Sequence, residues 1–397
     1  MCGLLGVSCS ATQDFDKHLR SIVRPYRFSL IAWEFKTIPH EINQRISGRA
    51  KRTEDKVHLV TEHFSTVKQI GSLKSQIQAL NAGTGQGDLA SLEAKLHGLQ
   101  EEKTALEKAV ERIIEKQVKT ALAEQGIYNP LDSYIRLKIN FPPLNFKLEK
   151  PPHLLVISPR DRIDSIREIV LKQNISLKEM EAIEAQGDKL GVSSLVVKLG
   201  GLGSTYPTFV TDEASLRFTL DAAAEEWVHQ YLFFKPLGFL YALDLTGVSR
   251  NYEIATMNET AASMVGKEIG AIVYHKYYSQ DENGDNRSQI AGSDFDFNKE
   301  MRDIRRQVDK YLAQGEIEAA EEFMEEKRQY LASKGYYIRK LNQAYFAYYG
   351  TYADSPTSIS PIGLEMKKLR EQSTSLKEFL NKAASMTSRQ NLIDSLK

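Results

Sequence analysis

Three residues that could carry chemistry stand close together in the segment A-E-E-W-V-H: Glu225, Glu226 and His229. The surrounding sequence favours a helix over residues 221–238, which the closing P-L-G would end. Residues four apart share a helix face, so Glu225 and His229 would lie one above the other, with Glu226 about 100° round the helix. This is the spacing of the zinc-binding motif H-E-x-x-H with a glutamate in place of the first histidine. The segment therefore predicts a metal-binding helix whose first ligand is altered.

A catalytic metal site needs three protein ligands and one open position. Glu259 offers the third ligand, because it follows His229 on a separate expected helix, in the context N-E-T-A-A. Glu226 would then be free to take a proton from metal-bound water, whose pKa the ion lowers. One imidazole and two carboxylates from Glu225, His229 and Glu259 make a hard ligand set. We expect zinc first, with manganese or iron(II) more competitive than in the unaltered motif.

A strand and a Gly-rich stretch precede this helix. V-S-S-L-V-V-K-L is expected to be a strand and leads into G-G-L-G-S-T-Y-P-T-F-V. Such an edge could pair with an extended substrate, so Gly201, Gly203, Thr205 and Tyr206 are candidate substrate-binding residues. An ordinary turn into a helix explains the glycines equally well.

Composition excludes several classes of protein. The chain has 397 residues, of which 42% are hydrophobic and 26% charged, and Lys+Arg equal Asp+Glu at 52 each. Zero net charge removes the general electrostatic argument for nucleic acid or an anionic membrane surface. With two cysteines there is neither a disulfide framework nor a cysteine zinc site. No run of 18 apolar residues is long enough to span a membrane.

The N-terminus, M-C-G-L-L-G-V-S-C-S, allows three interpretations. M-C-G is how class II glutamine amidotransferases begin, with Cys2 as the nucleophile, but nothing downstream supports such a domain. Residues 4–9 are similar to the end of a lipoprotein signal, although the basic and apolar regions of a full signal are missing. An ordinary terminus is the third interpretation. Localisation therefore stays open between cytoplasmic and extracytoplasmic, and membrane association is expected only if the N-terminal cysteine is lipidated.

Three regions are expected along the chain. Residues 1–54 form an N-terminal segment. Residues 55–128 have apolar positions three and four apart on both sides of N-A-G-T-G-Q-G-D, which predicts an antiparallel helical hairpin, a coiled-coil arm for a protein partner or self-association. Residues 129–397 form the third region, with strands over 133–148, 153–158 and 192–199. Helices are expected over 163–171, 176–187, 252–270, 297–346 with breaks near 314 and 334, and 362–384.

The order of motifs resembles one family. A Gly-rich T-Y-P loop, A-E-E-W-V-H-Q-Y-L, N-E-T-A-A and K-G-Y-Y-I-R-K-L-N-Q-A-Y-F-A follow one another as do the motifs of bacterial aminopeptidases of the gluzincin zinc-metallopeptidase type. The resemblance covers residues 192–380. It implies that His229 and Glu259 bind zinc, that Glu226 is the base, and that Arg339, Asn342 and Tyr345 face the active-site cleft.

Taken together, these observations predict an α+β, mostly helical protein: a gluzincin-like domain with a small sheet, plus the helical-hairpin arm. The expected activity is metal-dependent hydrolysis of a peptide substrate, with Glu226 and Tyr345 as catalytic residues. One tyrosine of the stripe formed by Tyr345, Tyr348, Tyr349 and Tyr352 would donate to the oxyanion, although tyrosines at helical spacing commonly pack a core. The alternative is a non-catalytic protein of the same fold that binds partners through its cleft and arm. An aminopeptidase also needs a carboxylate for the substrate amine, and no residue stands out for that role.

Overall fold

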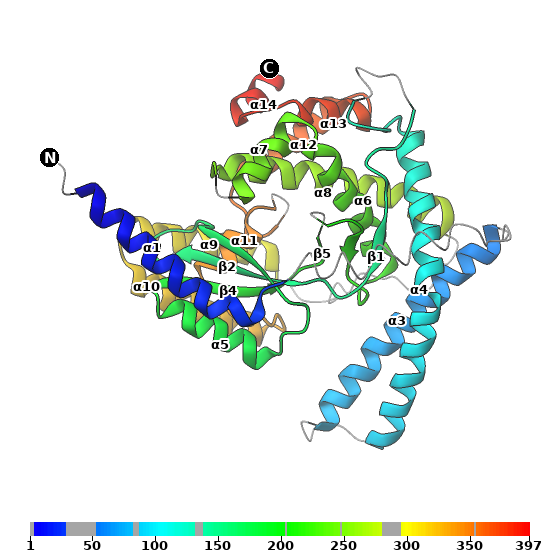
Figure 1. The fold of residues 1–397 in the computed structure, drawn as a ribbon, viewed down its shortest axis with the longest axis horizontal. Helices are drawn as coiled ribbons and strands as arrows, with labels where there is room; N and C mark the ends of the chain where they lie inside the picture. Colours follow the sequence, from blue (N-terminus) through cyan, green and yellow to red (C-terminus); the bar gives the residue numbers. More distant parts are fainter. Residues whose placement is uncertain are drawn as a thin grey trace.

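The fold is described by a computed structural model over residues 4–28, 53–81, 87–131, 138–202, 205–246, 248–279, 295–352 and 355–397, without the side chains of residues 4–13. Helices dominate, and the described strands form two small three-stranded sheets (Figure 1). This confirms the α+β, mostly helical class. Cys2, Gly203 and the loop around residues 281–292 lie outside the described residues.

The elements follow one another in this order: α1 (Leu4–Val23), η1 (Arg24–Tyr26), α3 (Thr53–Asn81), α4 (Leu89–Glu124), β1 (Phe146–Leu148), β2 (His153–Pro159), β3 (Arg167–Leu171), α5 (Leu177–Asp188), β4 (Val192–Lys198), β5 (Gly201–Leu202), β6 (Thr208–Val210), α6 (Leu216–Phe233), α7 (Pro236–Leu245), α8 (Tyr252–Tyr277), α9 (Phe297–Ala313), α10 (Ile317–Ser333), α11 (Gln343–Tyr349), α12 (Ile362–Gln372), α13 (Leu376–Ala384) and α14 (Arg389–Ser395).

The expected helical hairpin is present as α3 and α4, which project together from the rest of the molecule (Figure 1). Asp88 caps α4 by accepting from the backbone N–H of Ala90 at 3.2 Å. The root of the hairpin is not separate from the main body, because Val60, Val110 and Ile114 are fully buried in the largest core. The hairpin therefore projects as an arm only near its tip, while its root is part of the main hydrophobic core.

The first sheet has the order β3-β2-β4, and all its strands are antiparallel. One face packs against α1 and α5 through residues such as Leu155 and Ile157. The other face, with Leu154 and Val156, packs against α11. The expected helix over residues 163–171 is wrong, because residues from Arg167 to Leu171 form β3. Pairing with β2 satisfies this β-branched segment better than an isolated helical turn would.

The second sheet has the order β1-β6-β5, with β1 parallel and β5 antiparallel to β6. β5 is its edge strand, and it lies beside α6. Strands expected over 153–158 and 192–199 are confirmed as β2 and β4. Of the strand expected over 133–148, residues 146–148 form β1 and residues 138–141 are irregular, while residues 132–137 are outside the described part.

Helix α6 packs against β5 and β6 of the second sheet, and α7 and α8 pack on α6 in the largest core (Figure 1). α6 begins earlier than predicted, where Ser215 caps the helix by accepting from Phe218 N–H at 3.3 Å. Pro236 does not end α6. It is the first residue of α7, a position that proline favours because its missing N–H has no helical partner there.

The helices expected over 176–187 and 252–270 are confirmed as α5 and α8, and α9 and α10 confirm the break near residue 314. Beyond residue 334 the expected helix is interrupted before α11. The single helix expected over 362–384 is wrong, because Ser375 ends the irregular link after α12 and caps α13 by accepting from Glu378 N–H at 3.1 Å. Of the described helices, none is both long enough and apolar enough for a membrane crossing.

Candidate metal centre

Close antiparallel packing of α6 and α8 creates the candidate site. Gly266 and Gly270 allow this contact, because a Cβ on Gly266 would lie 2.8 Å from Glu225 Cβ, and one on Gly270 would fall within 2.9 Å of the Asp221 backbone. With Asp221 beside Gly270 and Glu225 beside Gly266, the next turn of α6 carries His229 towards the N-terminal half of α8. There it meets Glu259.

The structure brings together all three predicted ligands. One ligand atom each from Glu225, His229 and Glu259 lies within 4.8 Å of the other two. His229 Nε2 is 3.6 Å from Glu259 Oε2, and the two side chains are 17% and 11% exposed. Buried carboxylates are costly unless a cation or hydrogen bonds compensate them. A divalent ion between these groups would supply that compensation.

Asn258 was missed as a functional residue by sequence reasoning. Its side-chain amide lies 3.0 Å from His229 Nδ1, and the residue is only 1% exposed. Its Oδ1 is buried without a hydrogen-bond partner. Amide oxygen and nitrogen are assigned from hydrogen bonding, so rotating the amide by 180° lets Oδ1 accept from His229 Nδ1–H. This tautomer leaves the Nε2 lone pair for a metal, as the outer partners of metal-binding histidines commonly do.

Tyr241 on α7 holds the other glutamate. Its hydroxyl donates to Glu259 Oε1, while Oε2 faces His229. Burial raises the pKa of the Tyr241 phenol well above its usual value, and the charge of Glu259 raises it further. The phenol is therefore a firm hydrogen-bond donor that orients Glu259 for a ligand. The sequence offered no signal for it beyond a tyrosine in an apolar helix.

Two tyrosines at the end of α11 and just after it also respond to the charge of Glu259. The pKa of Tyr352 is raised well above its usual value, first by the negative charge of Glu259 and then by burial. Burial also raises the pKa of Tyr348, with a smaller effect from Glu259. Both follow or belong to α11, whose end is tied to α8 by Tyr252, which donates to Gly350 O at 2.9 Å. The negative charge of Glu259 therefore reaches the phenols of both tyrosines.

Glu226, the predicted base, points towards the edge strand β5. A Cβ on Gly201 would lie 2.2 Å from Glu226 Oε1, so only glycine leaves room for the carboxylate. One turn further along α6, Gln230 donates to the Thr205 carbonyl at 3.1 Å. Glu226 and Gln230 thus line one side of α6 along the segment that contains Gly201 and Thr205.

The remaining substrate-binding candidates near this edge differ in exposure. Thr205 is 2% exposed and its hydroxyl donates to Leu202 O at 3.1 Å, which makes it part of the loop's own structure. Tyr206 is 44% exposed. The described part of the loop therefore offers Gly201 beside Glu226 and, separately, the exposed ring of Tyr206.

Arg339, Asn342 and Tyr345 lie against the first sheet. The Arg339 guanidinium donates to both carboxylate oxygens of Glu184, at 2.8 and 2.6 Å, and Asn342 donates to Ser194 O at 2.9 Å. The Tyr345 ring contacts Tyr349, with centroids 4.5 Å apart. These contacts join α11 and the segment before it to β4 and α5, rather than to α6 or α8.

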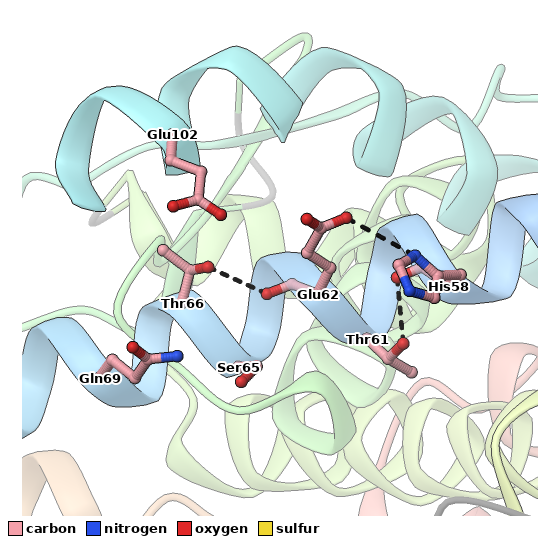
Figure 2. A pocket seen from close by; sticks show the side chains of 7 residues that line it. All are labelled: His58, Thr61, Glu62, Ser65, Thr66, Gln69 and Glu102. Carbon is pink, nitrogen blue, oxygen red and sulfur yellow. Dashed lines mark hydrogen bonds and ion pairs between the residues drawn. The ribbon is translucent and has the colours of Figure 1, made fainter. Parts of the chain in front are cut away.

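A second group of polar residues lies on the arm. Between α3 and α4, a groove is lined by His58, Thr61, Glu62, Ser65, Thr66, Gln69 and Glu102 (Figure 2). His58 and Glu62 face each other within one helix, and Glu102 lies opposite on α4 (Figure 2). A metal centre needs at least three ligand residues close together. Among the described residues, such a group is found on α6 and α8 and not in this groove.

Comparison with known proteins adds no relative: no family model, no curated protein and no solved structure matches the chain. Fold and site geometry define an α+β, mostly helical protein with a candidate Glu-His-Glu metal centre.

Proposed function

We propose that the chain is a metal-dependent peptidase that binds its ion through Glu225, His229 and Glu259. The observation that carries the proposal is the convergence of these three ligand residues from two helices, with one ligand atom of each within 4.8 Å of the others, in a largely buried position. Without a bound cation, the carboxylates of Glu225 and Glu259 would leave uncompensated negative charge in a largely buried position.

The donor set suits a divalent ion. Two carboxylates and one neutral imidazole give a charge of −2, which zinc, manganese or iron(II) would neutralise. Tyr241 donates to Glu259, and the Asn258 amide contacts His229 Nδ1, so two of the ligands are kept oriented. A bound ion of this kind would supply Lewis-acid polarisation of a carbonyl and a water of lowered pKa. Zinc is the first expectation.

Glu226 suits the role of general base. It lies next to Glu225 but about 100° round the helix, so it need not be a ligand itself. It can accept a proton from water at the centre and return it to the leaving amine. Gly201 of β5 leaves room for this carboxylate, because a side chain there would displace it.

Metal content and peptide hydrolysis test the proposal. Purified protein should retain about one equivalent of zinc, manganese or iron after dialysis, consistent with affinities of three-ligand sites. Glu226→Gln should keep the metal and lose hydrolysis by about a hundredfold or more, as expected for a missing general base. Protein that stays metal-free after reconstitution, or a Glu226→Gln variant with unchanged hydrolysis, would contradict the proposal.

The alternative is a protein of the same fold that binds without catalysis, and the feature that favours it is Glu225 itself. A glutamate in the first ligand position lowers the Lewis acidity of the ion. Glu225→His distinguishes the two possibilities. If Glu225 is a ligand, the variant should bind zinc more tightly and hydrolyse peptide at least as well. If it is not, zinc affinity should not change.

A further inference from the structure

Exposed phenylalanines gather at the corner between α6 and α7. Five phenylalanines of the described part of the chain are at least 41% exposed, and four of them lie here: Phe141, Phe233, Phe234 and Phe239. The ring of Phe234 contacts those of Phe141 and Phe233, with centroids 5.1 and 5.4 Å apart. Single exposed apolar side chains are ordinary, but a contiguous group of them marks a binding surface.

Three of these rings wall an open groove. Its volume is about 730 Å³, and Phe233, Phe234 and Phe239 line it together with Pro236, Leu240 and Thr387. This volume is in the range of sites for small organic molecules. The Thr387 hydroxyl donates to Asn391 Oδ1 at 3.1 Å and so already has a partner. The walls are therefore almost wholly apolar.

Lys235 is the exception. Among the described residues that line the groove it is the one charged group, and none of them is a carboxylate. Its ammonium forms no ion pair or hydrogen bond with the described part of the chain, and its side chain does not cap α7. Burial lowers the pKa of this ammonium. An ammonium partly withdrawn from water beside apolar rings is stabilised by an anion that brings its own apolar body.

The polar groups of the groove decide between possible occupants. An extended peptide would place a row of amide groups against rings that cannot hydrogen-bond them, which is costly. A second copy seated about a two-fold axis would bring the same surface, with its lysine and without a carboxylate, against itself. A molecule with one anionic head and an aliphatic chain matches one ammonium and apolar walls.

We propose that this groove binds a monomeric long-chain fatty acid, with the carboxylate at Lys235 and the chain along the phenylalanine rings. Each methylene that leaves water for the groove adds to the affinity, and the head group fixes the orientation of the chain. None of the candidate metal ligands lines the groove. Binding therefore needs neither a metal nor peptide hydrolysis.

Calorimetric titration of the full, metal-free chain tests the proposal, with dodecanoate below its micelle concentration as the probe. Decanoate should bind about tenfold more weakly than dodecanoate, because it buries two methylenes fewer. Lys235→Met keeps the apolar stem and removes the charge. This variant should bind dodecanoate about tenfold more weakly, the size of one charge-assisted hydrogen bond, and should bind dodecanol as wild type does. Phe239→Ser should weaken the binding of both probes.

Two matched controls lie outside the groove. Lys178→Met changes an exposed lysine beside the exposed Leu177 on α5, and Phe218→Ser changes the remaining exposed phenylalanine, near the start of α6. Both variants should bind dodecanoate as wild type does. Circular dichroism and urea unfolding check that Phe239→Ser is folded.

Several results would overturn the proposal. Wild-type protein without saturable binding of dodecanoate, or Lys235→Met that binds it as tightly as wild type, would do so. Equally tight binding of dodecyltrimethylammonium would show that the groove does not recognise an anion. If free dodecanoate does not bind but the protein sediments with phosphatidylcholine–phosphatidylserine vesicles, the occupant is a membrane surface. A dimer that Phe239→Ser dissociates would instead identify a second copy as the occupant.

Discussion

Two histidine–glutamate pairs in this protein have the same separation and very different surroundings. On the arm, His58 Nδ1 lies 3.6 Å from Glu62 Oε2, with side chains 77% and 42% exposed. In the main body, His229 Nε2 lies 3.6 Å from Glu259 Oε2, with exposures of 17% and 11%. Distance alone therefore does not distinguish a surface pair from a candidate metal centre.

The two pairs differ in which helices carry their residues and in how the side chains are held. His58 and Glu62 come from consecutive turns of one helix, and water solvates both. His229 and Glu259 come from two helices that pack closely at glycines. The Asn258 amide contacts His229 Nδ1, and the Tyr241 hydroxyl donates to Glu259 Oε1. A metal centre needs such convergence because each ligand must be held before the ion arrives.

The largest expected effect separates the two histidines directly. His229→Ala should weaken zinc binding by about a hundredfold or more, because it removes a ligand rather than an outer partner. His58→Ala should leave zinc content unchanged. Metal analysis after dialysis against a weak chelator measures both variants. Zinc retained by His229→Ala would place the ion elsewhere.

A buried histidine on the arm sharpens the comparison. His63 is 0% exposed and neither ring nitrogen has a hydrogen-bond partner. Burial, followed by the charge of Lys103, lowers its pKa from 6.5 to about 4, while Asp212, the ion-pair partner of Lys103, acts in the opposite direction. Burial alone thus makes no metal centre, because a neighbouring lysine disfavours a second cation.

This shift sets a pH dependence. The unfolded chain binds a proton at His63 below pH 6.5 and the folded chain only below about 4, so the free energy of unfolding should fall as the pH drops from 6.5 to 4. The full effect is about 3 kcal/mol, from about 1.4 kcal/mol per pKa unit. His63→Leu should lose this part of the slope in urea unfolding at several pH values, and His58→Leu should keep it. Equal slopes for His63→Leu and wild type would contradict the lowered pKa of His63.

Asn258 tests the outer support of the centre. Asn258→Leu should weaken zinc binding by about tenfold to a hundredfold, the usual cost of losing an outer partner of a ligand. Asn258→Asp should restore it, since a carboxylate also accepts from His229 Nδ1–H. Thr66→Ala on the arm, which removes a bond to Glu62 O, is the control and should have no effect. If Asn258→Asp binds as weakly as Asn258→Leu, the amide has another role.

The same contrast explains what the sequence could predict. Local signals were sufficient for α5, where Ser176 and Glu179 form a capping box, and for the hairpin, where apolar spacing is regular. They failed for β3, since Ile166, Ile169 and Val170 fit a helical spacing as well as a strand. The pairing of β3 with β2 is a long-range contact that no local pattern contains.

The candidate centre divides in the same way. Glu225 and His229 could be paired from their spacing within one helix, and Glu259 from its context in a second helix. Tyr241 and Asn258 could not be assigned, because their roles depend on how α6, α7 and α8 pack.

Glycine contacts offer a matched pair between the two regions. Gly266→Ala should destabilise the fold by roughly 1–3 kcal/mol, because the new Cβ would lie 2.8 Å from Glu225 Cβ. Gly71→Ala in α3 meets nothing within 4 Å and should stabilise by roughly 0.5–1 kcal/mol. Urea unfolding measures both. A neutral Gly266→Ala would mean that α6 and α8 can separate without cost, and the ligands would not be preorganised.

The smallest expected effect belongs to the exposed pair. Glu62→Gln should change the free energy of unfolding by less than about 0.5 kcal/mol, because exposed ion pairs one helical turn apart are solvated and screened by salt. The same substitution in the centre, Glu259→Gln, should cost metal affinity and leave Tyr241 without its charged acceptor. Unfolding with and without zinc measures both variants, since a bound ion stabilises only the folded state. If zinc stabilises Glu259→Gln as strongly as wild type, Glu259 is not a metal ligand. The His229–Glu259 pair would then differ from the His58–Glu62 pair in burial but not in metal binding.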